Sequence, residues 1–116
     1  MWTLSDVLIL RCVGGHDRAT GSPLRGVIAT ADYLDHAVPL EEEFTGAVGR
    51  LLGAGLLECD VAADRYWLTA AGRLLAERRG RSAVKPADLE RLDLPAGGAW
   101  SLPAGTYRAA VDAYLA

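Results

Sequence analysis

Apolar residues recur at helical spacing three times in the first half of the chain, and polar or glycine-rich breaks separate the three segments. The first helix is expected to start after Thr3, which has the spacing of a capping box with Asp6. Leu4, Val7, Leu8 and Cys12 share one face of this helix, and Ile9, Leu10 and Val13 add others, so the helix is expected to be covered on most sides. Gly14 and Gly15 are expected to end it, because glycine readily takes the left-handed conformation found at helix C-termini.

Two further helices are expected before residue 55. In the second helix, Ser22 is the expected N-cap and Pro23 the first helical residue, because the fixed backbone of proline suits that position. This helix is expected to end near His36. The third helix is expected over about residues 40–54, with Gly55 at its C-terminal end.

The third predicted helix has an apolar side and a polar side, and its first turn is acidic. Its buried stripe is expected to consist of Phe44, Val48, Leu51 and Leu52. Its outward face is then expected to consist of Glu42, Glu43, Thr45, Gly46, Gly49 and Arg50. Glutamates in a first turn stabilise the helix, because the helix dipole places partial positive charge there.

The pattern then changes from helical spacing to alternation. Residues 56–60 and 65–68 alternate apolar with polar side chains on either side of a short turn, which predicts a two-stranded β-hairpin. Thr69 is the expected N-cap of a fourth helix that runs through Arg79. The residues of this helix expected to face inward are Leu74 and Leu75.

The last third of the chain has a weaker pattern. A short helix is expected from Pro86 to Leu92, with Leu89 and Leu92 turned inward, followed by a loop over residues 94–105. A final helix is expected from about Thr106. Its apolar stripe is expected to hold Tyr107, Ala110, Val111, Tyr114 and Leu115. The expected fold class is therefore mostly α-helical with one small β-hairpin.

Two short strings match a known arrangement of such elements. Residues 49–57, Gly-Arg-Leu-Leu-Gly-Ala-Gly-Leu-Leu, resemble the end of the third helix and the start of the wing in MarR-type and PadR-type regulators. Residues 68–72, Leu-Thr-Ala-Ala-Gly, resemble the string that leaves the wing in the MarR group. The resemblance covers about residues 3–80. It implies a winged helix-turn-helix domain in residues 1–80, of order α-α-α-β-β-α, with residues 81–116 as a C-terminal helical extension.

The same resemblance implies a bacterial-type, DNA-binding transcriptional regulator that is usually a homodimer. In such a protein the third helix enters the major groove and the wing contacts the backbone or the minor groove. If this chain binds DNA, we expect Thr45, Arg50 and Arg65 to make groove contacts. The extension would pack on its own domain or on a dimer partner, and both arrangements stay open. The candidate dimer face consists of Tyr107, Val111, Tyr114 and Leu115.

Composition limits the classes of protein that this chain can belong to. The 116 residues suit one domain, and 51% hydrophobic with 23% charged residues is ordinary for a packed globule. No apolar run has the length of a membrane span, and no secretory signal is recognisable. Cys12 and Cys59 are too few for a disulfide scaffold, so we expect core thiols and a reducing, cytoplasmic setting.

The formal net charge of −3 hides a strong asymmetry. Residues 23–64 hold eight acidic and two basic residues, whereas residues 65–85 hold six basic residues and one acidic residue. The candidate basic patch consists of Arg73, Arg78, Arg79, Arg81 and Lys85. These side chains either contact phosphates from outside the groove or form a solvated helix end that suits the helix dipole.

The charge of the third helix favours protein–protein contacts over DNA binding. Three glutamates in the turn that should meet base edges would be repelled by the DNA backbone. The hairpin tip carries Asp60 and Asp64 where a DNA-binding wing typically carries cations. We therefore favour a regulatory module that acts through protein–protein contacts, with a protein partner or a second copy. A MarR-like or PadR-like DNA-binding regulator remains the alternative.

An enzyme is the least favoured class. His16 and His36 lie in different predicted loops, and no nucleophile or zinc motif surrounds them. Asp32, Asp35 and His36 could be imagined as metal ligands, but a solvated helix end is the better interpretation. We expect no catalytic residues, no metal and no cofactor.

Overall fold

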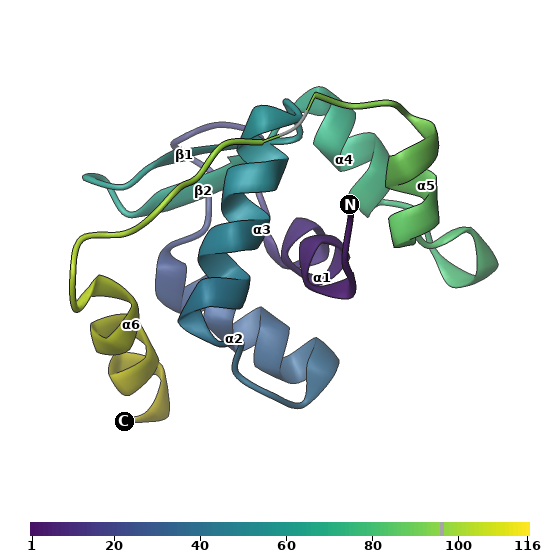
Figure 1. Cartoon of the computed structure of the whole chain (residues 1–116). Helices are drawn as coiled ribbons and strands as arrows, with labels where there is room; N and C mark the ends of the chain where they lie inside the picture. The colour runs from purple at the N-terminus through teal and green to yellow at the C-terminus, as the bar shows by residue number, and fades with distance from the viewer. Residues whose placement is uncertain (96) are drawn as a thin grey trace.

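The computed structural model describes residues 1–95 and 97–116, and it shows a group of helices with a two-stranded β-hairpin at one side (Figure 1). The elements in chain order are α1 (Leu4–Cys12), α2 (Leu24–Asp35), α3 (Glu41–Gly53), β1 (Leu57–Asp60), β2 (Arg65–Leu68), α4 (Ala70–Ala76), the 3₁₀ turn η1 (Gly80–Ser82), α5 (Pro86–Arg91) and α6 (Thr106–Leu115). The prediction of a mostly helical chain with one small hairpin is confirmed. No helix in the described ranges is long and apolar enough to cross a membrane.

Two predicted helix starts are confirmed by their capping hydrogen bonds. The Asp6 carboxylate accepts the Thr3 N–H at 2.8 Å, and the Thr3 hydroxyl accepts the Asp6 N–H at 3.3 Å. The Thr69 hydroxyl accepts the Gly72 N–H at 3.1 Å and donates to the Gly55 carbonyl at 2.7 Å. The threonine that starts α4 therefore also ties this helix to the end of α3.

The predicted start of α2 is wrong by one residue, for a reason that lies in the hairpin. Pro23 is the N-cap of α2, because the backbone of Ser22 is paired with Tyr66 of β2 through two hydrogen bonds of 2.7 and 2.8 Å. The side chain that caps α2 comes from the hairpin turn instead. The Asp64 carboxylate accepts the Leu24 N–H at 2.9 Å.

Two predicted helix ends also differ. Helix α1 ends with Val13 in an extended conformation, and the left-handed residue is Gly15, which lies beyond the cap. Helix α4 ends at Ala76 and does not reach Arg79. Leu74 was expected to face inward, but it is 72% exposed. A Cβ at Gly72 would collide with the Leu56 carbonyl, so α4 turns its Gly72 face inward and Leu74 lies on the opposite side.

The core is built by α1, α2, α3 and the inner face of the hairpin. Phe44, Val48 and Leu51 of α3 are fully buried as predicted, whereas Leu52 is only half-buried. Leu57 pairs with Leu68, and Cys59 pairs with Tyr66, which confirms the predicted alternation of the strands. Further buried residues are Ile9, Leu10, Val27, Ile28, Leu56 and Leu89.

The C-terminal third wraps back over this core (Figure 1). After α5, the chain crosses α3, descends beside the hairpin and ends in α6, which packs along α2. Leu92, which was expected to face inward, is 48% exposed because α5 ends before it. Because the C-terminal third crosses α3, it covers part of the surface of this helix and leaves the rest accessible (Figure 1).

Candidate functional site

The first turn of α3 is exposed and acidic, as predicted. Glu41, Glu42 and Glu43 are all exposed. The Glu43 carboxylate accepts the Leu40 N–H at 3.0 Å, so this side chain also caps its own helix. The turn of the helix that the resemblance would place against base edges therefore presents carboxylates to solvent.

Arg50 is partly exposed, but its guanidinium is not free for a ligand as predicted. Its Nε and Nη2 atoms donate to Oδ1 of Asp6 at 2.8 and 2.7 Å, and Asp6 is fully buried. The side chain lies over Gly46, where an added Cβ would be 3.3 Å from the guanidinium nitrogens. Gly46 thus leaves room for an ion pair between α3 and α1.

The middle of α3 is covered by the chain itself. We call residues 97–102 the strap. A Cβ added at Gly49 would lie 2.7 Å from the Gly98 carbonyl oxygen and 3.1 Å from Cβ of Trp100. A Cβ added at Gly97 would collide with the Gly49 carbonyl oxygen and with Cα of Arg50. Gly49 is buried and not outward as predicted, because glycine on each side lets the two backbones cross.

An aromatic cluster fastens the strap to the core. Its centre is the buried ring of Phe44, whose centroid lies 5.8 Å from Tyr66, 6.3 Å from Trp100 and 5.3 Å from Tyr107. Tyr66 and Trp100 also contact each other edge to face. Burial raises the pKa of Tyr107 to about 12 and raises that of Tyr66 further still. The aromatic cluster therefore joins α3, β2, the strap and α6.

The other two residues predicted to contact DNA are partly exposed. Thr45 is half-buried on α3, and Arg65 is half-buried at the start of β2, where its Nη1 donates to the Asp64 carbonyl at 2.9 Å. The acidic hairpin tip has structural partners of its own. Asp60 pairs with Arg18 at 2.8 Å, and Asp64 caps α2. Of the two arginines at the tip, Arg18 is paired with Asp60 and Arg65 is bonded to a backbone carbonyl.

The predicted basic patch is divided by the fold. Arg78 lies 3.9 Å from the Asp88 carboxylate of α5, whose pKa is lowered chiefly by a hydrogen bond from the Lys85 N–H. Lys85 Nζ donates to the Arg81 carbonyl at 3.3 Å. Arg73 and Arg79 lie instead on the side of α4 that faces the end of α1. The five residues therefore have different neighbours, and only Arg73 and Arg79 line the same hollow.

The predicted dimer face is divided between internal and external contacts. Tyr107 is buried and donates to the Pro39 carbonyl, and the Tyr114 hydroxyl donates to Asp32 at 2.6 Å, which raises the pKa of Tyr114. Leu115 is 66% exposed. It borders a groove of about 380 Å³, which we call the α3–α6 groove. The apolar lining of this groove consists of Val38, Pro39, Leu40, Tyr107, Val111 and Leu115.

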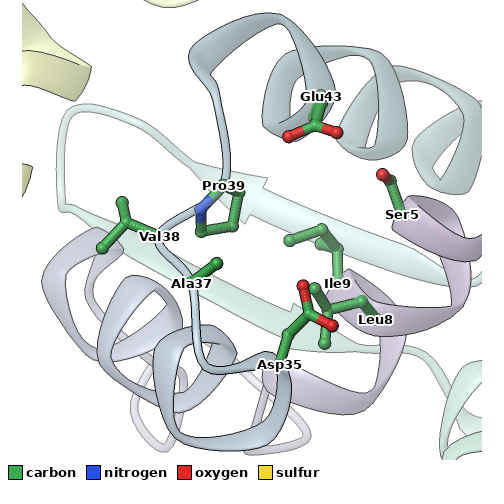
Figure 2. A pocket seen from close by; sticks show the side chains of 8 residues that line it. All are labelled: Ser5, Leu8, Ile9, Asp35, Ala37, Val38, Pro39 and Glu43. Atoms are coloured by element: carbon green, nitrogen blue, oxygen red, sulfur yellow. The ribbon is translucent and has the colours of Figure 1, made fainter.

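A second hollow, beneath the turn between α2 and α3, brings two carboxylates together. Figure 2 shows Asp35 and Glu43 on opposite sides of it, with Ser5 at its edge. Its volume is about 60 Å³, which suits water molecules and not an organic substrate. In the part of the chain that the structure describes, no three His, Cys, Asp or Glu residues are arranged to hold a metal ion.

The two cysteines are free thiols, as expected. Cys12 is buried in α1, and desolvation raises its pKa to about 12. Cys59 is half-buried, and desolvation raises its pKa as well. Desolvation thus raises the pKa of both thiols and disfavours the thiolate, which is the reactive form of cysteine.

No family model, no curated protein and no solved structure matches this chain. The features of the chain that bear on its function are the surface of α3, the groove beside it and the charges around α4.

Proposed function

We propose that this protein is a non-catalytic winged-helix module that acts through protein–protein contacts and does not read DNA. The observation that carries the proposal is the covered face of α3. The strap crosses the helix at Gly49, and Arg50 is bonded to the buried Asp6 carboxylate. A winged helix reads DNA by inserting the third helix into the major groove, and here a segment of the same chain occupies part of that helix surface.

The charge of what remains exposed supports the same proposal. DNA binding draws much of its free energy from cations that replace counterions on phosphates. The uncovered end of α3 carries three glutamates, and the tip of the hairpin carries two aspartates with structural partners. Both surfaces that would approach a duplex are therefore poor in cations.

The α3–α6 groove is the surface that suits a protein partner. Leu40 is 60% exposed and Leu115 is 66% exposed on its two sides. Charged residues of α3 and α6 surround this apolar centre, namely Glu41, Arg108 and Asp112. An apolar centre with a polar rim is typical of protein interfaces. In this proposal the groove binds a second copy of the chain or another protein.

Binding to random duplex DNA at low salt tests the first half of the proposal. We expect no change in the fluorescence anisotropy of a labelled duplex, because the surface of α3 offers carboxylates where phosphates need cations. The double variant Glu42→Gln, Glu43→Gln should also fail to bind, since the strap still covers the helix. Salt-sensitive binding by the wild type that becomes tighter in this variant would instead favour the DNA-binding regulator.

Sedimentation velocity tests the second half. We expect concentration-dependent self-association of the wild type, and we expect Leu115→Asp to weaken it by about tenfold because a charge would be desolvated in the groove. Leu74→Asp is the matched control, because Leu74 is equally exposed but lies on α4, away from the groove. Equal effects of the two substitutions, or a wild type that stays monomeric, would argue against self-association through this groove.

A further inference from the structure

A third hollow, of about 210 Å³, lies on a different part of the surface, between the C-terminal end of α1, the glycine turn after it, the end of β2 and α4. Arg11 reaches it from α1, while Arg73 and Arg79 reach it from α4 and the residues that follow α4. Glu77 is the one acidic residue in its lining. We call this hollow the arginine pocket.

The three arginines of the pocket have no carboxylate partner within the described residues. Five other arginines do have one, namely Arg18, Arg50, Arg78, Arg91 and Arg108. Like charges around one hollow repel each other, and a bound anion would relieve this repulsion. The pocket thus has an excess of positive charge even after Glu77 is counted.

Hydrogen bonds within the protein hold part of the wall of the arginine pocket. Arg79 Nη1 donates to the Ala76 and Arg78 carbonyls at 2.8 and 3.1 Å, which orients its guanidinium at the end of α4. The Gly14 N–H donates to the Ser22 hydroxyl at 3.0 Å, which orients the glycine turn. Groups that are already oriented lose less conformational entropy when a ligand binds.

We infer that the arginine pocket binds a phosphate group, either as inorganic phosphate or on a phosphorylated side chain of a partner protein. Guanidinium groups match the geometry of phosphate oxygens, and three cations with one carboxylate leave two positive charges for a dianion. The volume lies below the roughly 300–1,000 Å³ of pockets for drug-sized ligands, so it suits one phosphate group and not a whole nucleotide.

A phosphate of duplex DNA fits this pocket less well. Binding to a duplex requires contacts to several successive phosphates, whereas the pocket is a single concave site. Glu77 at its lining would also oppose a polyanion passing along α4. The pocket shares no lining residue with the α3–α6 groove, so this inference stands apart from the proposed function.

Isothermal titration calorimetry on the full chain at constant ionic strength tests the inference. Inorganic phosphate should bind, and Arg73→Gln should weaken it by about tenfold through loss of a charged hydrogen bond. Glu77→Gln should tighten binding severalfold. Arg81→Gln should change nothing, because Arg81 belongs to the same basic segment but does not line the pocket. All three side chains are exposed, so thermal melting should show folded variants.

The source of the phosphate is decided by two further titrations. A phosphoserine peptide that binds at least about tenfold more tightly than inorganic phosphate, and whose unphosphorylated form does not bind, would assign the site to a modified partner. Equal affinity for the peptide and for inorganic phosphate would assign it to the free anion. The inference is overturned if neither ligand binds, if Arg81→Gln weakens binding as much as Arg73→Gln, or if duplex DNA binds more tightly than both ligands.

Discussion

Replacing Arg50 with alanine should lower the free energy of unfolding by about 3–5 kcal/mol. The substitution removes both hydrogen bonds to Oδ1 of Asp6 and leaves that fully buried carboxylate without a cation. The carboxylate would keep only its hydrogen bond from the Thr3 N–H. Urea denaturation followed by circular dichroism measures the change, with the midpoint expected to fall while the slope stays constant.

Two further variants test whether the loss in Arg50→Ala comes from the buried ion pair and not from the removal of any surface arginine. Arg65→Ala should change the free energy of unfolding by less than about 0.5 kcal/mol, because Arg65 has no carboxylate partner among the described residues. The double variant Asp6→Asn, Arg50→Met should recover most of the loss, because it removes the buried charge while Asn can still accept the Thr3 N–H. A loss for Arg50→Ala as small as that for Arg65→Ala would contradict the ion pair.

Replacing Phe44 with alanine should also lower the free energy of unfolding by about 3–5 kcal/mol. Phe44 is fully buried, and its ring is the one that contacts each of the other three rings of the aromatic cluster. The cavity would remove the surface on which Trp100 packs, so the strap should loosen along with the loss of stability. Urea denaturation gives the first quantity, and acrylamide quenching of Trp100 gives the second.

The quenching experiment uses the background Trp2→Phe, Trp67→Phe, so that Trp100 is the only fluorophore of its kind. Phe44→Leu serves as the matched variant, because it retains much of the apolar volume. It should lower the free energy of unfolding less than Phe44→Ala, and acrylamide should quench Trp100 less in it. Phe44→Ala with unchanged quenching of Trp100 would mean that the strap does not depend on this cluster. Covering of α3 by the strap would then need another explanation.

Local signals in the sequence were sufficient for most of the secondary structure. The capping box at Thr3, the N-cap at Thr69 and the alternation in the two strands each depend on residues only a few positions apart. The errors came where a distant segment intervened. Pro23 caps α2 because Ser22 pairs with β2, and the capping carboxylate comes from Asp64, 40 residues away.

Distant segments caused more errors in the prediction of the candidate site than in that of the secondary structure. Gly46 and Gly49 were predicted to lie on the outward face of the third helix, but a guanidinium approaches α3 closely at Gly46 and a second backbone does so at Gly49. Arg50 was predicted to be available for DNA, but its partner Asp6 lies 44 positions away in the chain and also caps α1. The arginine pocket could not be read from sequence spacing either, because Arg11 and Arg73 line the same hollow from two different helices.

The sequence by itself determined the order of the helices and strands, the acidic first turn of α3 and the uneven distribution of charge, because these follow from hydrophobic period, capping residues and composition. Only the tertiary structure decided that the strap covers α3, that Arg50 pairs with Asp6 and that three arginines surround one pocket. These features join residues that are far apart in the chain, and their energies depend on burial and distance, which local periodicity does not record.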